Sequence, residues 1–499
     1  MKMKTFNIKT IWFLIISVII TESYAQNTFD LLISTPWHEV ITNSVEDNDG
    51  NYYFAGWKAE LYSSEKCGWL IKINHNGEII NEMTFCATDT TTILSDLKIN
   101  NDTLIVFGMK GSLSEGKNII MKMALDLDFN LLLNDNDQIL SGYYLSSLNS
   151  IYTRKGNLLI CGNVTSIENS QDYDIYFYEL DNYLDSIRLV VDSREFIQNA
   201  VDFIEDTINH CYKVIGFGSY ENAYPGYDEL IEFDTLFNFV EVDSVPWYLK
   251  NQFSVERLNN NNYLISGKKH IIDADRVDLG IIKLNNADEL LARNHFGKGG
   301  DTINYPAINS ISLNMSNEIF FGGTSNISNT FDPFPAEDSW LILNKLDTNL
   351  NLILQNFYGG DAFYHMIGLQ ATGDGGCLIY SERYDENTQI DEYDVYILKV
   401  DSSGLLTSTG DYTSIPVQQL SISPNPARDR VRIGYPDIFE NDEKELMIYN
   451  AFGVLVMKID ATDENSQITI DTIDLPGGLY FIVLNVNGKK TANGKMVKS

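Results

Sequence analysis

The sequence predicts an all-β protein whose main part is a seven-bladed β-propeller. Three observations predict this fold. A short apolar strand that usually ends in glycine recurs along the chain, a second apolar strand with a lysine near its end alternates with it, and no segment has the apolar spacing and capping residues of a helix. The first strand has seven copies, with a period of about 54 residues. The copies lie at residues 52–56, 104–108, 158–162, 212–216, 263–267, 319–323 and 377–381.

The second strand closes with an aspartate or asparagine in six of the seven units. Clear copies lie at residues 69–74, 281–285, 344–347 and 396–401, and weaker ones at 120–123, 176–181 and 230–234. Because the closing residue recurs, we interpret it as part of the fold rather than of a functional site. One more apolar segment precedes the first strand and another follows the second, so each unit contains four short antiparallel strands.

Seven such units in tandem favour a closed ring, because each small sheet buries its faces only against its neighbours and closure shields the sheet edges. Residues 28–34 (TFDLLIS) form an apolar strand with no unit of its own. We expect this strand to pair with the last unit and to close the ring. An open β-solenoid is the alternative, although its repeats are shorter and more regular.

The two ends of the chain differ from the repeats. Residues 1–25 are predicted to be a signal peptide, since three lysines precede the apolar segment 11–20 and a Ser-Tyr-Ala cleavage site follows it. No other segment approaches the length of a membrane-spanning helix, so we expect an exported protein with no transmembrane segment. The remaining predicted boundaries are the propeller at 26–412, a polar linker at 413–419 and a small C-terminal β-sandwich at 420–499.

Composition and charge exclude several classes of protein. With 44% hydrophobic and 12% aromatic residues among 499, the chain is too apolar to be disordered. The formal net charge of −34 argues against nucleic acid and against an anionic membrane surface as partners. That charge belongs to residues 26–419, because the small charges of the signal and C-terminal segments cancel.

Four motifs follow one another in the last 80 residues. They are a proline-rich entry at 423–427, a central strand that ends in glycine at 448–453, a Pro-Gly-Gly turn before a strand at 475–483 and a basic end at 495–498. Their order and spacing resemble the type A C-terminal sorting domain of type IX secretion cargo. The residues that carry the resemblance are Pro424, Asn425, Pro426, Gly453, Gly477, Gly478, Tyr480 and Lys498.

The resemblance implies an address tag that the type IX secretion machinery recognises, and that is removed or used for attachment at the outer membrane. We therefore expect a protein that is secreted from, or attached to the surface of, a bacterium with an outer membrane. An ordinary sandwich module is the alternative. The repeats look similar to those of many secreted propellers, a likeness that implies no chemistry.

Five cysteines are present, and pairing is expected in an exported protein. Cys67 and Cys86 are symmetric about Asn76-Gly77, so a two-residue hairpin would place them directly opposite each other. That hairpin makes them a hydrogen-bonded pair, in which a disulfide fits less well, and the bridge is left open. Cys161, Cys211 and Cys377 lie in first strands and are expected to be buried.

No catalytic residue, metal site or cofactor is predicted. The chain has no G-x-S-x-G motif, and its six histidines form no ligand cluster. The segment around Asp47 and Asp49 hints at calcium, but it lacks the spaced ligands of a calcium loop and is better explained as a tight turn. The pattern favours a protein without enzymatic activity and leaves the question open.

The loops between the two repeated strands differ most from unit to unit, and loops on a rigid scaffold often carry binding function. They combine acids, Asp278 among them, with aromatic residues, a mixture that suits a glycan, a peptide or a divalent cation. An acidic rim that only keeps the protein soluble is the alternative. The candidate ligand-binding residues are Tyr220, Tyr224, Tyr227, Phe331, Phe334, Tyr384, Asp385, Asp391 and Tyr393.

The sequence thus favours a secreted or cell-surface binding protein. A secreted hydrolase acting on polysaccharide is the second hypothesis, because an acidic chain always offers paired carboxylates. A structural surface-layer or adhesion protein is the third.

Overall fold

The computed structural model describes most of the chain beyond residue 26, and its contacts divide the chain into two units, 1–408 and 409–499. The predicted signal peptide and residues 413–417 of the predicted linker lie outside the described residues. The described ranges are 27–60, 63–112, 117–137, 143–166, 173–194, 197–219, 227–246, 248–272, 276–299, 302–327, 335, 337–387, 392–406, 418–434, 444–450, 455–461, 467–473, 475–486 and 489–498.

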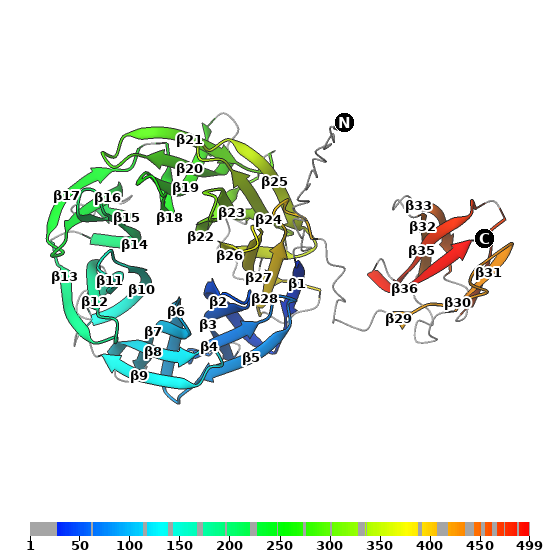
Figure 1. The fold of residues 1–499 in the computed structure, drawn as a ribbon, viewed down its shortest axis with the longest axis horizontal. Coiled ribbons are helices and arrows are strands. Elements are labelled where there is room, and N and C mark those ends of the chain that lie inside the picture. Colours follow the sequence, from blue (N-terminus) through cyan, green and yellow to red (C-terminus); the bar gives the residue numbers. More distant parts are fainter. Residues whose placement is uncertain are drawn as a thin grey trace, which may run out of the picture. The chain divides into compact units, whose positions relative to one another are not determined.

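Within the described residues, the first unit contains five four-stranded antiparallel sheets and one eight-stranded sheet, arranged around a common centre (Figure 1). The first two sheets are β2 (Trp37–Glu46), β3 (Tyr52–Glu60), β4 (Cys67–Ile73) and β5 (Ile79–Phe85), then β6 (Thr90–Asn100), β7 (Thr103–Ser112), β8 (Lys117–Asp126) and β9 (Leu131–Asp137). The third and fourth are β10 (Tyr143–Tyr152), β11 (Leu158–Ser166), β12 (Tyr173–Leu180) and β13 (Ser186–Asp192), then β14 (Ile197–Asp206), β15 (Cys211–Ser219), β16 (Tyr227–Asp234) and β17 (Phe239–Ser244). The fifth is β18 (Lys250–Arg257), β19 (Tyr263–Ile271), β20 (Arg276–Leu284) and β21 (Leu290–Phe296).

The eight-stranded sheet consists of two antiparallel sets joined by one parallel pair, Asn309 opposite Gly368. The first set is β22 (Asn304–Leu313), β23 (Ile319–Ser325), β24 (Trp340–Leu346) and β25 (Leu352–Gly359), and the second is β26 (Phe363–Ala371), β27 (Cys377–Tyr384), β28 (Asp394–Val400) and β1 (Phe29–Ile33). The predicted closing strand is confirmed, because β1 pairs antiparallel with β28 and places Leu31 opposite Ile397. The all-β propeller architecture is therefore as predicted.

Each sheet buries its faces against the next sheet, as the repeat predicts. One core cluster joins Tyr53 and Leu70 of the first sheet to Leu94 and Val106 of the second. Another is aromatic: the ring of Phe177 lies 4.8 Å from the rings of both Phe233 and Phe237 in the following sheet. Such rings bury large apolar areas, so contacts between sheets supply much of the stability.

The residue that closes the second strand has the same role in every sheet. Its side-chain Oδ1 accepts hydrogen bonds from the backbone N–H groups two and four positions later, at 2.8 to 3.0 Å. This Asx turn opens the loop to the outermost strand. The sequence pattern finds six of the seven copies, and the structure adds Asp126. The copies are Asn74, Asp126, Asp181, Asp234, Asn285, Asp347 and Asp401.

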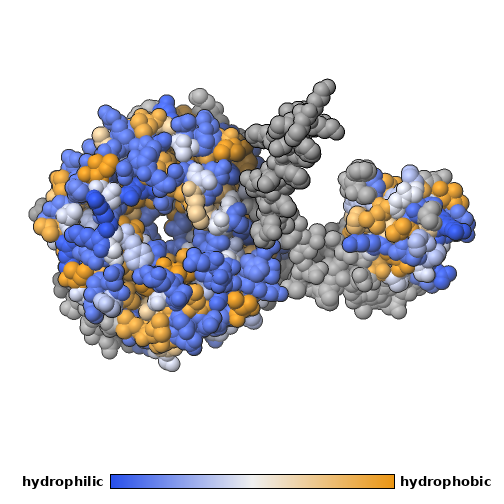
Figure 2. All heavy atoms as spheres, in the orientation of Figure 1, coloured by the Kyte–Doolittle hydropathy of each residue, from blue (hydrophilic) through white to orange (hydrophobic). Residues whose placement is uncertain are grey.

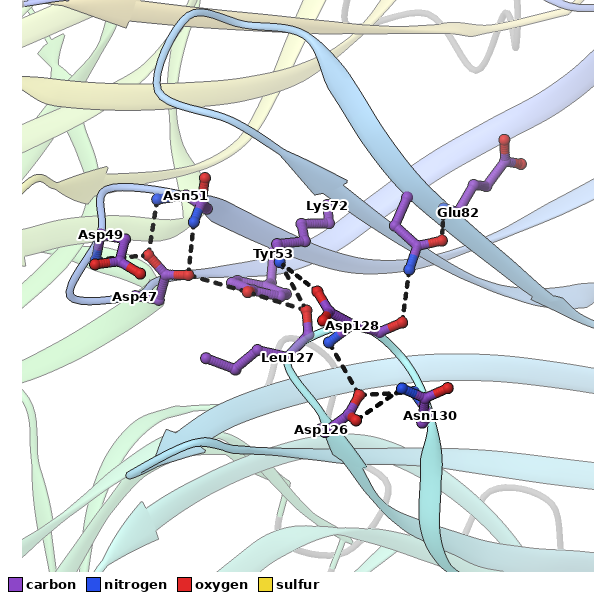
Figure 3. A network of polar contacts seen from close by, with 11 residues as sticks. Asp47, Asp49, Asn51, Tyr53, Lys72, Glu82, Asp126, Leu127, Asp128 and Asn130 are labelled. Atoms are coloured by element: carbon purple, nitrogen blue, oxygen red, sulfur yellow. Dashed lines mark hydrogen bonds and ion pairs between the residues drawn. The ribbon is translucent and has the colours of Figure 1, made fainter.

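In four of the seven repeats, the lysine of the second strand links its own repeat to the Asx turn of the next one (Figure 3). Lys72 Nζ donates to the carbonyl oxygen of Leu127 at 2.9 Å and lies 3.2 Å from Asp128. Tyr53 donates to the same carbonyl at 3.2 Å. The equivalent lysines repeat the contact: Lys122 donates to Leu184, Lys283 to Thr348 and Lys345 to Ser402, all at carbonyl oxygens.

Figure 3 also shows the segment around Asp47 and Asp49, which forms the turn that the sequence favours. Asp47 accepts the backbone N–H groups of Asp49 and Asn51 at 2.9 and 2.8 Å, and the hydroxyl of Tyr53 at 3.0 Å. Within the described residues, no group of three or more His, Cys, Asp or Glu side chains is placed to hold a metal ion.

The first sheet contains a disulfide between Cys67 and Cys86, whose Cα atoms are 4.5 Å apart. The predicted two-residue hairpin is wrong: Gly77 N–H bonds to the Asn74 carbonyl, which makes a longer turn with Gly77 at φ 85°. A bulge between Lys72 and Ile73 then restores the predicted register. Because the bulge inverts the hydrogen-bonding alternation, the cysteines have the short Cα separation of a non-hydrogen-bonded pair. The other three cysteines are free and buried.

The second unit has a five-stranded and a three-stranded sheet, which share one apolar core that includes Val431, Ile433, Ile448 and Ile482. The larger sheet is β29 (Gln418–Gln419), β36 (Lys489–Lys498), β35 (Gly478–Val486), β32 (Lys444–Asn450) and β33 (Leu455–Asp460). The smaller is β30 (Ser421–Ser423), β31 (Arg430–Gly434) and β34 (Gln467–Asp471). The described elements contain no helix that is both long and apolar enough to cross a membrane.

Candidate functional site

The predicted ligand-binding residues are described only in part. Tyr384, Asp385 and Tyr393 are described, and Tyr227 is described by its backbone in β16. The others lie outside the described residues, namely Tyr220, Tyr224, Phe331, Phe334 and Asp391.

Tyr384 and Tyr393 are neighbours in one aromatic group beside the junction of β2 and β28. Their ring centroids are 5.9 Å apart, and the ring of Tyr393 lies 5.2 Å from that of His38. His38 stacks on Trp57 at 5.3 Å, and Lys66 Nζ lies 3.7 Å from the centroid of the same indole. Since Tyr384 is only 7% exposed, it packs against its neighbours and does not offer an open ring face to a sugar.

Asp385 and Asp278 are already engaged by protein groups. Asp385 accepts hydrogen bonds from Asn387 and from Arg383 Nη2, the latter at 3.2 Å. Burial raises its pKa, but these bonds and the guanidinium charge outweigh burial and hold the pKa below its usual range. Asp278 is buried and lies 2.8 Å from His295 Nδ1 and 2.9 Å from Arg276 Nε. Both carboxylates are therefore engaged within the protein, Asp278 in strand β20 and Asp385 directly after β27.

A buried acid lies at the same junction of first and last sheets. Glu39 of β2 is 0% exposed, accepts a hydrogen bond from the Thr35 hydroxyl, and has no partner on Oε2 among the described residues. Burial raises the pKa of Glu39 to about 8; the Thr35 bond opposes the shift and the charge of Asp394 adds to it. Glu39 is thus protonated at neutral pH.

An axial cavity of about 540 Å³ lies at the centre of the ring (Figure 2). All seven innermost strands contribute to its wall, from β2 to β26. Each of these strands has a register irregularity in its middle. A bulge re-aims the side chains that follow it, and here polar side chains face the axis. The volume falls within the range of small-molecule sites.

A chain of side-chain hydrogen bonds joins neighbouring strands around this cavity. Asn43 Nδ2 donates to Asp96 Oδ1 at 2.6 Å, and Ser150 donates its N–H and hydroxyl to Asp96 Oδ2 at 2.8 and 2.5 Å. Asn149 Nδ2 donates to Asp202 Oδ1 at 3.0 Å. The sequence reading missed these residues, although the 53-residue spacing within each of the pairs Asn43–Asp96 and Asn149–Asp202 was a usable signal.

Two carboxyl groups of the cavity have raised pKa values. Burial raises the pKa of Asp202 to about 6, although the backbone N–H groups of Val255 and Phe203 and the amide of Asn149 lower it. Burial, followed by the charge of Asp202, raises the pKa of Glu256 to about 7. The cavity therefore changes its charge near neutral pH.

The sorting residues of the second unit meet at its C-terminal strand. Asn425 Nδ2 donates to the Lys495 carbonyl at 2.7 Å, and Asn425 Oδ1 accepts the N–H of Val497 at 2.8 Å. Gly478 pairs with Lys498 across β35 and β36, and the Tyr480 hydroxyl donates to the Pro476 carbonyl at 2.7 Å. Both peptide bonds that precede Pro424 and Pro426 are cis. Gly453 lies outside the described residues.

Residues 421–499 match the family described as "Secretion system C-terminal sorting domain". This part of the chain is a type IX secretion sorting domain. The protein is accordingly exported across the outer membrane to the cell surface or the medium, and its sorting domain implies contact with the type IX secretion machinery.

Solved structures similar to the chain include other propellers. The β-propeller domain of the Trilobed protease from Pyrococcus furiosus is 11% identical, with a TM-score of 0.42, and the match covers 76% of this chain and 99% of that one. The Pyrococcus horikoshii acylaminoacyl peptidase is 12% identical, with a TM-score of 0.42 and coverage of 81% and 59%. PorZ, a type IX secretion surface component of Porphyromonas gingivalis, is 10% identical, with a TM-score of 0.22 and coverage of 92% and 75%. No curated protein matches significantly.

Proposed function

We propose that this sorting-domain protein is an extracellular binding protein, and that its propeller holds a small polar ligand in the axial cavity. The observation that carries the proposal is that cavity, lined by side chains from all seven innermost strands. A site on the hydrogen-bonded strands of a closed ring is held rigidly, which lowers the entropic cost of binding.

We further propose that the ring has seven blades and that the sorting domain is a β-sandwich. The two halves of the eight-stranded sheet each have four antiparallel strands and meet at one parallel pair, which supports counting them as separate blades. In the sorting domain, two sheets that contribute to a single core support a sandwich.

The experiment is a small-molecule screen by ligand-observed NMR with the chain that lacks residues 1–25. Glycans, peptides, diols, organic acids and amines are tested, because the chemistry of the cavity is polar. We expect hits whose binding is lost in Ser254→Trp, which fills the cavity from β18. If hits bind this variant as well as they bind the wild type, the binding site lies in the loops and not in the cavity. If no compound binds, the result supports a structural surface protein instead.

The hydrolase alternative finds one supporting feature, the protonated Glu39 beside Asp394, since a general acid needs a raised pKa. Both side chains are almost completely buried, so a polysaccharide has no access to them in this conformation. Binding without turnover is therefore the better supported function.

A further inference from the structure

We propose that the axial cavity binds a primary ammonium group on a short aliphatic chain, and that Glu256 is the residue that recognises it. The inference rests on the proposed function, since it names the chemistry of the ligand in that same cavity.

Charge is the first argument. The charged residues of the cavity wall are four acids and two bases: Asp96, Asp202, Glu205, Glu256, Lys98 and Arg257. With the acids ionised, acids outnumber bases, and acidic residues predominate across the whole chain. The electrostatic potential of the cavity therefore favours the binding of a cation and opposes the binding of an anion.

Five of these six groups are already bound by the protein. Asp96 pairs with Lys98 at 2.9 Å and also accepts bonds from Asn43 and Ser150. Glu205 Oε2 accepts the N–H of Arg154 at 2.6 Å. Arg257 Nη1 donates to the carbonyl of Glu205 and to the Thr207 hydroxyl.

Asp202 is bound as well: it accepts the N–H groups of Phe203 and Val255 and the amide of Asn149. Glu256, like Glu205, accepts a single backbone N–H, and it differs from Glu205 because the charge of Asp202 acts on it across the cavity. Among the described residues, the donor on its carboxylate is the backbone N–H of Arg257, and no side chain forms an ion pair with it. The negative charge of Asp202 on β14 and the positive charges of Lys98 on β6 and of Arg257 act on this carboxylate.

The shape and lining favour an alkylammonium over a bare metal ion. Tyr152 lines the same cavity and is 39% exposed, so its ring can offer an apolar surface to methylene groups and a π face to the ammonium. The described residues offer no cluster of three acidic, histidine or cysteine ligands for a metal. An ammonium instead needs one carboxylate and a few neutral acceptors, which serine and asparagine side chains of the wall supply.

The test uses putrescine as the probe and the chain that lacks residues 1–25, titrated by calorimetry at low ionic strength. Putrescine should bind at pH 8 and bind on the order of tenfold more weakly at pH 6, because a carboxyl with a pKa near 7 is mostly protonated there. The uncharged analogue butane-1,4-diol should not bind. E256Q should abolish putrescine binding at both pH values, and E337Q, on an exposed loop, should leave it unchanged.

Equal binding of putrescine by wild type and E256Q overturns the assignment, as does binding that is equal at pH 6 and pH 8. If potassium displaces putrescine when both are at the same concentration, the aliphatic chain does not contribute to recognition, and that part of the proposal is wrong. The pH profile of the wild type tests the proposal even if E256Q fails to fold. If a neutral molecule from the screen binds in the cavity and putrescine does not, the proposed function stands and this inference fails.

Discussion

Asn43 and Asp96 lie 53 residues apart on neighbouring inner strands and are joined by a 2.6 Å hydrogen bond at the axis of the propeller. Asp96 is 1% exposed and also accepts bonds from Ser150 and Leu97 and pairs with Lys98. One carboxylate thus links three consecutive inner strands.

Replacing this carboxylate tests its contribution to stability. Asp96→Ala leaves several buried donors without an acceptor, so we expect the free energy of unfolding to fall by about 3 kcal/mol. Urea denaturation followed by tryptophan fluorescence measures the change. Asp338→Asn, on an exposed loop, is the matched control and should shift the free energy by less than about 0.5 kcal/mol. A change in Asp96→Ala as small as that of the control would contradict the role.

Glu39 predicts a pH dependence of stability. Its pKa is about 8 in the folded protein against the ordinary value of 4.5, so the unfolded chain loses this proton first as pH rises. The free energy of unfolding should therefore fall between about pH 4.5 and pH 8. Above pH 8 the ionisation of Glu39 should cause no further change. Glu39→Gln removes this contribution, and at pH 8 it should be more stable than wild type by about 3 to 5 kcal/mol. Thermal denaturation from pH 5 to pH 9 gives both curves, and parallel curves would refute the assignment.

The repeated lysine predicts a stability contribution between sheets. Lys72→Met keeps the aliphatic stem but removes the donor to the Leu127 carbonyl, and should cost about 1 to 3 kcal/mol in urea unfolding. Lys155→Met, at an exposed turn, is the charge-matched control. If both substitutions lower the free energy of unfolding by the same amount, the change in net charge explains the effect, and the hydrogen bond between sheets does not.

The disulfide predicts a thiol count. Alkylation in denaturant without reductant should modify three cysteines, and five after reduction, as intact mass reports. The variant Cys67→Ser/Cys86→Ser should lose about 3 kcal/mol of stability, since the bridge closes a loop between residues 19 apart. Five modified cysteines without reductant would exclude the bridge.

Asn425 predicts a specific sorting defect. Its side chain bonds to two backbone groups of the C-terminal strand, so Asn425→Ala should loosen the contact between the proline-rich entry and that strand. We expect the variant to accumulate in the periplasm, as deletion of residues 420–499 should also do. Fractionation and immunoblotting measure the distribution. Asn485→Ala, on β35 of the same domain, is the control for a general loss of folding. If Asn425→Ala is exported normally, the contact is not needed for sorting.

Much of the fold was predictable, because periodicity alone reports the repeats. The closing Asx residue was readable in six units and escaped notice at Asp126, where Ala124 and Leu125 blur the strand pattern. The turn at Gly77 and the bulge beside Lys72 were not predictable, since two irregularities compensate in register and leave no trace in the alternation.

The axial cavity was missed for a related reason. Bulges in the innermost strands turn Asn43, Asp96 and Asp202 toward the axis. The alternation of apolar and polar residues in the sequence does not reveal these bulges, so it did not predict a polar cavity wall. Two of the predicted ligand-binding aromatic residues show what composition leaves open: Tyr384, at the end of β27, and Tyr393 pack against each other, and Tyr384 is only 7% exposed. The sequence shows which residues are aromatic, but only the structure shows whether their side chains are exposed to a ligand.

The pairing of β1 with β28 imposes an order on synthesis and export. The strand made first finds its partner only after residue 400 has been made, so no length of nascent chain short of that point holds a finished ring. A protein that leaves the ribosome or crosses a membrane amino end first must carry this early strand unsatisfied until the rest arrives.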